Sequence, residues 1–67
     1  MHIGSGVRAA MALKRIGPTK VAVALSCSTQ QVHYRLNQED WRHSEIQRYA
    51  EVIGVTEDDI LDFARKA

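Results

Sequence analysis

The chain has 67 residues, 45% hydrophobic and 25% charged, a composition typical of one small folded domain over residues 1–67 and not of a disordered or repetitive chain. Because Cys27 is the one cysteine, an intramolecular disulfide framework and a cysteine-built zinc site are excluded. The sequence has no apolar run of membrane-spanning length and no signal-like start. We therefore expect a cytoplasmic protein without a cofactor. The formal net charge of +1 is small for a protein that binds nucleic acid, whose surface is usually basic.

The N-terminal part of the chain predicts two helices with a glycine-proline break at 17–18 between them. Ser5 is the expected N-cap of a helix over residues 6–16, and glycine followed by proline is a typical helix end. Thr19 is the expected N-cap of a short helix over residues 20–26.

A third short helix is predicted over residues 29–37. Ser28 and Gln31 have the spacing of a capping box, in which the side chain of each residue accepts a hydrogen bond from the backbone amide of the other. Val32 and Leu36 lie one turn apart and must face the core.

Two further helices complete an all-α fold. Ser44 and Gln47 repeat the capping-box spacing before a helix over residues 45–53. Thr56 precedes three acidic residues, which favour the first turn of a helix over residues 57–66. No segment alternates polar and apolar residues for long enough to predict a strand.

The second and third predicted helices have the spacing of a helix-turn-helix, spanning residues 19–37. Ala22 is small enough for a close helix crossing, and Cys27 is the expected buried plug of the turn rather than a nucleophile. Ser26 stands where such turns commonly use glycine to reach a left-handed backbone conformation. The pattern predicts a fold that places one helix in the major groove of DNA.

The charges are divided unevenly along the chain. Residues 1–38 hold five basic and no acidic side chains, a formal charge of +5, whereas residues 39–67 hold four basic and eight acidic ones, a formal charge of −4. The half that contains the helix-turn-helix is therefore suited to approach phosphate.

On these residues, the stretch 17–32 resembles the helix-turn-helix of the phage Cro and CI-type repressor family. The stretch 46–63 is similar to the last two helices of the all-helical members of that family. The resemblance implies a five-helix, lambda-repressor-like fold that binds double-stranded DNA. Residues 19–41, with the pair Asp40-Trp41, also resemble the CII-type phage activators, although the C-terminal tetramerising extension of that group is missing.

Base contacts are expected from the side of the third helix that faces away from Val32. Gln30 is the best candidate because its amide can pair with adenine in a bidentate manner. Gln31 is alternatively engaged in the capping box, and His33 is alternatively a solvated side chain. Tyr34 is equally a phosphate contact, a reader of a thymine methyl group or a surface aromatic. The predicted base-contacting residues are Thr29, Gln30, Gln31, His33 and Tyr34.

Phosphate contacts are expected at the ends of the two motif helices and beside them. Lys20 opposes the helix dipole in a first turn, a placement that makes sense if a phosphate docks there, although it is alternatively an ordinary solvated lysine. Arg35 and Arg42 are alternatively partners of Glu39 or Asp40. The predicted phosphate-contacting residues are Thr19, Lys20, Ser28, Arg35, Asn37 and Arg42.

A second copy of the chain is the expected protein partner, because a core of this size supplies little net stability. Trp41 is either a lid on the core or a dimer contact, with the dimer contact slightly favoured, and Phe63 is either a core or an interface residue.

The sequence thus predicts a Cro-like repressor that binds a palindromic operator as a homodimer, with no membrane or small-molecule partner. A protein-interaction module that keeps the fold, such as an antirepressor or adaptor, is the alternative that the near-neutral total charge favours, and a CII-like activator is a second one. No catalytic set of residues can be assembled, so we do not expect an enzyme.

Overall fold

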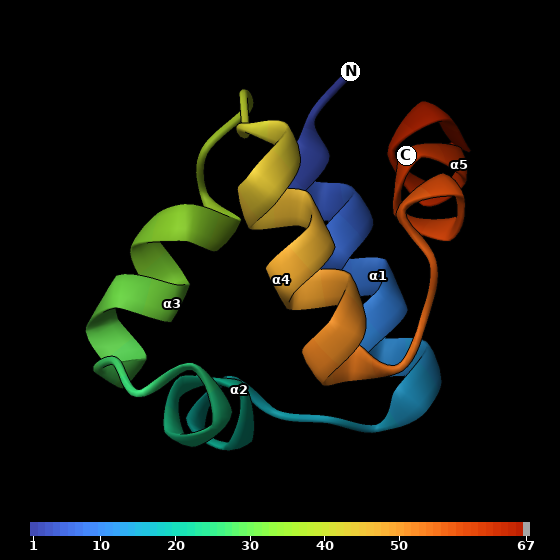
Figure 1. Ribbon diagram of the computed structural model, residues 1–67. Coiled ribbons are helices and arrows are strands. Elements are labelled where there is room, and N and C mark those ends of the chain that lie inside the picture. Colours follow the sequence, from blue (N-terminus) through green and yellow to red (C-terminus); the bar gives the residue numbers. More distant parts are fainter. Residues whose placement is uncertain (67) are drawn as a thin grey trace.

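Five helices account for all the regular structure of residues 1–66, the part of the chain that the computed structural model describes. Figure 1 shows them folded around α1, with α3 and α5 at opposite sides of the molecule. None of these five helices has the length and apolar composition needed to cross a bilayer. Their bounds are α1 Ile3–Lys14, α2 Pro18–Leu25, α3 Thr29–Leu36, α4 His43–Ile53 and α5 Glu57–Lys66.

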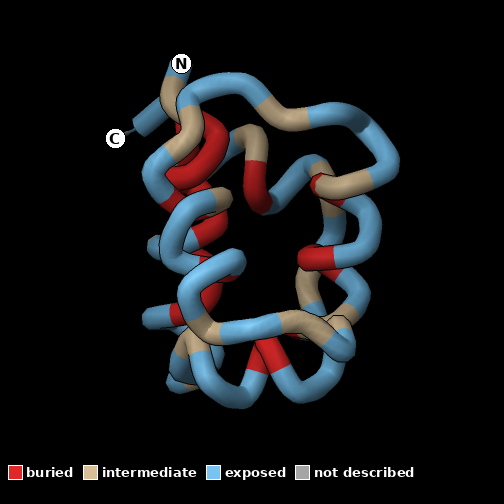
Figure 2. Tube along the Cα trace, turned by 90° about the vertical axis from the view of Figure 1, so that its left-hand side faces the viewer, coloured by how far each residue is buried: buried red, intermediate tan, exposed pale blue. Residues whose placement is uncertain are grey.

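The hydrophobic core lies between α1 and the other helices, each of which turns its apolar side inward (Figure 2). Its largest fully buried side chains are Val7, Val21, Val32, Leu36 and Ile60, so every helix except α4 contributes at least one of them. The helix α4 adds Ile46, Tyr49, Ala50 and Ile53. Burial of a large aliphatic side chain contributes roughly 1.5–3 kcal/mol, and these contacts are what hold the short helices in place.

Two glycines let α1 approach its neighbours closely. A Cβ atom on Gly4 would overlap the carbonyl oxygen of Leu36, and one on Gly6 would lie 2.9 Å from the Cβ of Ala64. The amide of Gly4 also donates to the carbonyl oxygen of Gln38 at 3.2 Å. The start of α1 is therefore packed directly against the end of α3.

The first helix begins and ends earlier than the predicted 6–16. Its N-cap is His2, whose Nδ1 accepts from the amide of Ser5 at 3.1 Å, so the prediction of Ser5 as N-cap is wrong. The amide of Ile3 donates to the carbonyl oxygen of Glu39 at 3.0 Å, which allows the helix to start at Ile3. The helix ends where Arg15 adopts a left-handed conformation with φ 56°, before the glycine that was expected to end it.

The second helix also begins earlier than predicted. Gly17 is its N-cap, without a side-chain hydrogen bond, and Pro18 occupies the first helical position. Proline suits that position because its missing amide would have had no partner there. Thr19 therefore lies inside the first turn, and its predicted N-cap role is wrong.

The fourth helix begins at His43 and not at residue 45. Arg42 is the N-cap residue, and its amide donates to the Glu45 carboxylate at 3.2 Å. The predicted capping box of Ser44 with Gln47 is therefore wrong, because Glu45, three residues after Arg42, satisfies a helix start two residues earlier.

The two remaining predicted caps are confirmed. The hydroxyl of Ser28 accepts from the amide of Gln31, and the Gln31 side-chain oxygen accepts from the amide of Ser28, both at 3.1 Å. Thr56 and Asp59 make the equivalent pair at 3.1 and 3.0 Å. The helices that follow these caps begin at the predicted residues, and α3 ends one residue before the predicted 37.

Candidate nucleic-acid interface

A turn of three residues joins α2 to α3. Ser26 adopts the left-handed conformation with φ 56°, as the spacing required of this position. The amide of Cys27 donates to the carbonyl oxygen of Ala22 at 3.0 Å, which ties the turn back onto α2. Ala22 is buried, whereas the predicted plug Cys27 is only half-buried and packs against the edge of the core. This local geometry fixes the direction in which α3 leaves α2.

One side of α3 packs on the core and the other is open. Val32 and Leu36 are buried, while Gln30, His33 and Tyr34 are exposed, Tyr34 to 63%. Their spacing of three and four residues places these three side chains on one face of the helix. We call Gln30, His33 and Tyr34 the reading face.

The other two predicted base-contacting residues are placed differently. Thr29 is half-buried at the first position of α3. Gln31 is exposed, but its side-chain oxygen is engaged by the amide of Ser28 in the capping box. The alternative role predicted for Gln31, as a capping residue, is the one that the structure supports.

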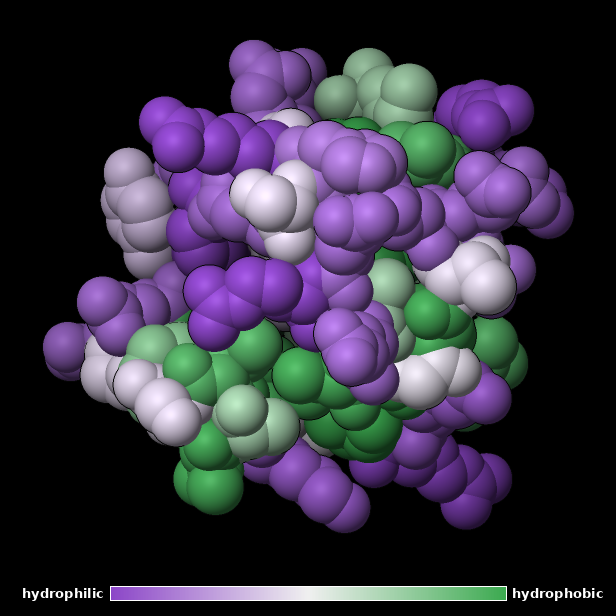
Figure 3. Space-filling model, viewed as in Figure 1, coloured by the Kyte–Doolittle hydropathy of each residue, from purple (hydrophilic) through white to green (hydrophobic). Residues whose placement is uncertain are grey.

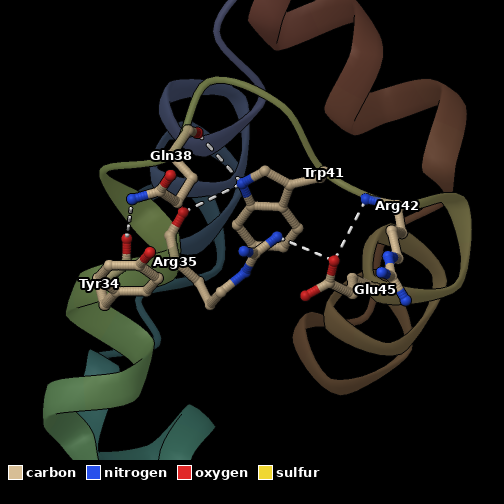
Figure 4. A network of polar contacts seen from close by, with 6 residues as sticks. All are labelled: Tyr34, Arg35, Gln38, Trp41, Arg42 and Glu45. Atoms are coloured by element: carbon tan, nitrogen blue, oxygen red, sulfur yellow. Dashed lines mark hydrogen bonds and ion pairs between the residues drawn. The ribbon is translucent and has the colours of Figure 1, made fainter.

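Arg35 makes its contacts within the chain. Its Nη2 donates to the Glu45 carboxylate at 2.9 Å, and its guanidinium lies 5.1 Å from the centre of the Trp41 ring (Figure 4). Figure 4 shows the Arg35 side chain reaching from α3 past the indole to α4. Its Nε atom is buried and has no hydrogen-bond partner. Arg35 therefore has an intramolecular ion-pair partner, and that partner is Glu45 and not the expected Glu39 or Asp40.

Asn37 is also engaged, at the end of α3. Its side-chain oxygen accepts from Nη2 of Arg8 on α1 at 2.8 Å. Sequence reasoning missed Arg8, because these two residues are 29 positions apart and no local pattern joins them. The contact places an exposed arginine of α1 beside the last turn of α3.

Trp41 is a half-buried lid over the α3–α4 junction. Its indole nitrogen donates to the carbonyl oxygens of Arg35 and Gln38 at 3.0 and 3.2 Å (Figure 4). Its ring meets Tyr49 edge-on, with the centroids 4.6 Å apart. Phe63 likewise packs half-buried against the core of its own chain. Within the single chain Trp41 therefore acts as the lid, one of its two predicted roles.

The remaining predicted phosphate contacts are accessible. Thr19, Lys20, Ser28 and Arg42 are all exposed, and no ion pair among residues 1–66 involves Lys20 or Arg42. No acidic residue lies in the first turn of α2 or α3. The three acids of the first turn of α5 lie on the helix at the far side of α1 from α3 (Figure 1). The first turns of α2 and α3 thus contribute no acidic side chain of their own.

The face of the molecule that is seen in Figure 1 has a hydrophilic part and a hydrophobic part. Hydrophilic side chains cover its upper part, including the start of α4, and hydrophobic ones gather over α2 and the C-terminal end of α4 (Figure 3). A cavity of about 360 Å³ lies between α3 and α4 and is lined by polar, aromatic and apolar side chains, among them Arg48 and Tyr49.

The pKa values of Tyr49 and Asp59 are shifted. Burial, and then the nearby Cys27, raise the pKa of Tyr49, so its phenol stays protonated at neutral pH. The backbone amide and then the hydroxyl of Thr56 lower the pKa of Asp59. Within residues 1–66, no three histidine, cysteine or acidic side chains lie close enough together to hold a metal ion.

No protein-family model, no curated protein and no solved structure matches the chain significantly.

Proposed function

We propose that this chain is a sequence-specific regulator that binds double-stranded DNA, with α2 and α3 acting as a helix-turn-helix in a lambda-repressor-like fold. The observation that carries the proposal is the reading face of α3, on which Gln30, His33 and Tyr34 are exposed while the opposite side is buried. A single α-helix fits the major groove, which is about 12 Å wide.

The chemistry of the reading face supports base recognition. A glutamine amide both donates and accepts, so Gln30 can pair with the two groups that adenine presents in the major groove. His33 can donate to a base, and Tyr34 can contact a thymine methyl group or a phosphate. None of the three side chains makes a hydrogen bond to another side chain among the described residues, which leaves these groups free for a ligand.

Accessible cations beside the motif helices support phosphate contacts. The cations Lys20 and Arg42 are accessible and unpaired within residues 1–66, and Thr19 and Ser28 are exposed near the helix starts. We propose these four residues as the phosphate contacts. Arg35 is left out because its guanidinium already pairs with Glu45, whereas Asn37, whose side-chain oxygen accepts from Arg8, keeps its amide nitrogen as the donor for a fifth phosphate contact.

We propose that the chain is a Cro-like repressor, which binds a palindromic operator as a homodimer. Two copies would present their reading helices to half-sites about 34 Å apart on one face of the duplex. A footprint restricted to one half-site would contradict the dimer.

One observation favours a second candidate, a protein-interaction module. Glu39 and Asp40 are exposed in the segment directly after α3, where their charges would repel phosphate, and the net charge of the chain is only +1.

Selection from a random duplex library, followed by fluorescence anisotropy at low salt, tests the proposal. Gln30→Ala should weaken binding to the selected sequence about 5- to 150-fold and relax preference at one base pair. Gln47→Ala, which removes an exposed glutamine from α4, is the matched control and should change affinity little. If no duplex is enriched, or if the two variants behave alike, the interaction module is the better description.

A further inference from the structure

The cavity between α3 and α4 has no role in the proposed DNA contacts except that Tyr34 belongs to both. We infer that this cavity is a binding site for a small planar aromatic carboxylate. Its volume of about 360 Å³ lies near the lower end of the range of roughly 300–1,000 Å³ in which proteins bind small molecules. The size therefore restricts the ligand to a small one.

The apolar part of the lining selects a flat, hydrophobic body. Tyr34 from α3 and Tyr49 from α4 both line the cavity, together with Leu25 and the half-buried Cys27. Aromatic rings from two neighbouring helices offer stacked or edge-on contacts to a third ring. A planar aromatic ligand can make such contacts with both tyrosines.

The charged part of the lining selects an anion. The lining includes two arginines, Arg35 and Arg48, and one carboxylate, Glu45, so it carries a net charge of +1. Glu45 is already held by Arg35, whereas Arg48 takes part in no ion pair among residues 1–66. The buried Nε of Arg35 also lacks a hydrogen-bond partner. A ligand carboxylate would neutralise the excess charge and accept from the unpaired guanidinium group of Arg48.

A ligand in the cavity would contact α3 directly. Gln31 and Tyr34 line it, so a ligand there would contact the capping residue and one reading residue of that helix. A change in DNA affinity on ligand binding rests on the proposed function, whereas the binding of the carboxylate itself does not.

Benzoate titrated into the full chain in the absence of DNA tests the inference. Trp41 is the one tryptophan of the chain, and its ring lies 5.1 Å from the Arg35 guanidinium that lines the cavity, so its fluorescence should report occupancy. Benzoate should give a saturable change and should bind about tenfold more tightly than neutral benzamide, the factor expected of one charge-assisted hydrogen bond. No saturable change, or equal affinity for the two compounds, overturns the inference.

Two further measurements locate the site. Arg48→Gln should remove the preference for benzoate over benzamide, while Arg65→Gln, an exposed arginine on α5 outside this cavity, should keep it. Bound benzoate should also slow the reaction of Cys27 with an aromatic disulfide reagent, because the thiol lines the same cavity. If the two arginine variants behave alike, or if benzoate leaves the rate at Cys27 unchanged, benzoate binds elsewhere and the inference is wrong.

Discussion

The ion pair between Arg35 and Glu45 offers a quantitative test of how α3 is held against α4. The two side chains are 25% and 31% exposed, between the fully exposed pairs that contribute about 0–1 kcal/mol and the buried pairs whose disruption costs about 3–5 kcal/mol. Glu45→Gln removes the charge but keeps an oxygen that can accept from the amide of Arg42. We expect this variant to lower the free energy of unfolding by about 1 kcal/mol.

Glu45→Ala should cost more than Glu45→Gln. It removes the partner of Arg35 and also the acceptor for the amide of Arg42 at the start of α4, a capping contribution of about 1 kcal/mol. The expected total loss is about 2 kcal/mol. The difference between the two variants therefore separates the ion pair from the cap.

Urea unfolding followed by Trp41 fluorescence and circular dichroism measures both losses. With a slope near 1 kcal/mol/M, which is usual for small domains, Glu45→Gln should lower the unfolding midpoint by about 1 M. Glu51→Gln, at an exposed position of α4 that forms no ion pair within residues 1–66, is the matched control. Equal midpoints for Glu45→Gln and Glu51→Gln would refute the view that this ion pair stabilises the α3–α4 junction.

Three other predictions address the helix contacts and the proposed interface. Gly4→Ala should destabilise the protein by about 2 kcal/mol or more in urea unfolding, because the added methyl group would overlap backbone atoms of α3, whereas Gly17→Ala, where the space is open, should change stability by less than about 1 kcal/mol. The hydrogen bonds from Thr56 lower the pKa of Asp59 below its usual 3.8, so the stability that they contribute is present above pH 3.8 and is lost as the pH falls through the lower, folded-state value. Asp59→Asn should remove this part of the acid dependence, and an unchanged profile of midpoint against pH would contradict the role of this cap. Lys20→Ala should weaken binding to all duplexes alike and reduce the slope of log affinity against log salt by about 1, whereas a loss confined to one sequence would identify Lys20 as a base contact.

The caps that the sequence predicted correctly are those made between residues three positions apart. Ser28 with Gln31, and the threonine before α5, find their partners within one turn, so local spacing placed these two helix starts. The same spacing was ambiguous at α4, where Ser44 with Gln47 matched the pattern but Arg42 with Glu45 forms the cap. The start of α1 could not be predicted in this way. The amide of Ile3 donates to the carbonyl oxygen of Glu39, and only the folded chain brings these two groups together.

The same distinction between local and distant partners explains which features of the candidate site the sequence predicted correctly. Helical spacing correctly predicted which side of α3 is buried, because the positions of Val32 and Leu36 relative to Gln30 depend on the helix alone. The state of Arg35 and Asn37 depends on partners in other helices, Glu45 and an arginine of α1, which no periodicity reveals.

Taken together, these contacts show why α3 can present so many free side chains. A helix of eight residues is not stable in isolation, so its position must be imposed from outside. It is held at its start by the capping box, along one side by the ion pair to α4, and at its end by Arg8 and by the close packing of Gly4. The anchors and the reading face therefore occupy different positions of the helix. Substitutions on the reading face should alter DNA affinity without altering stability, whereas substitutions of the anchors should alter both.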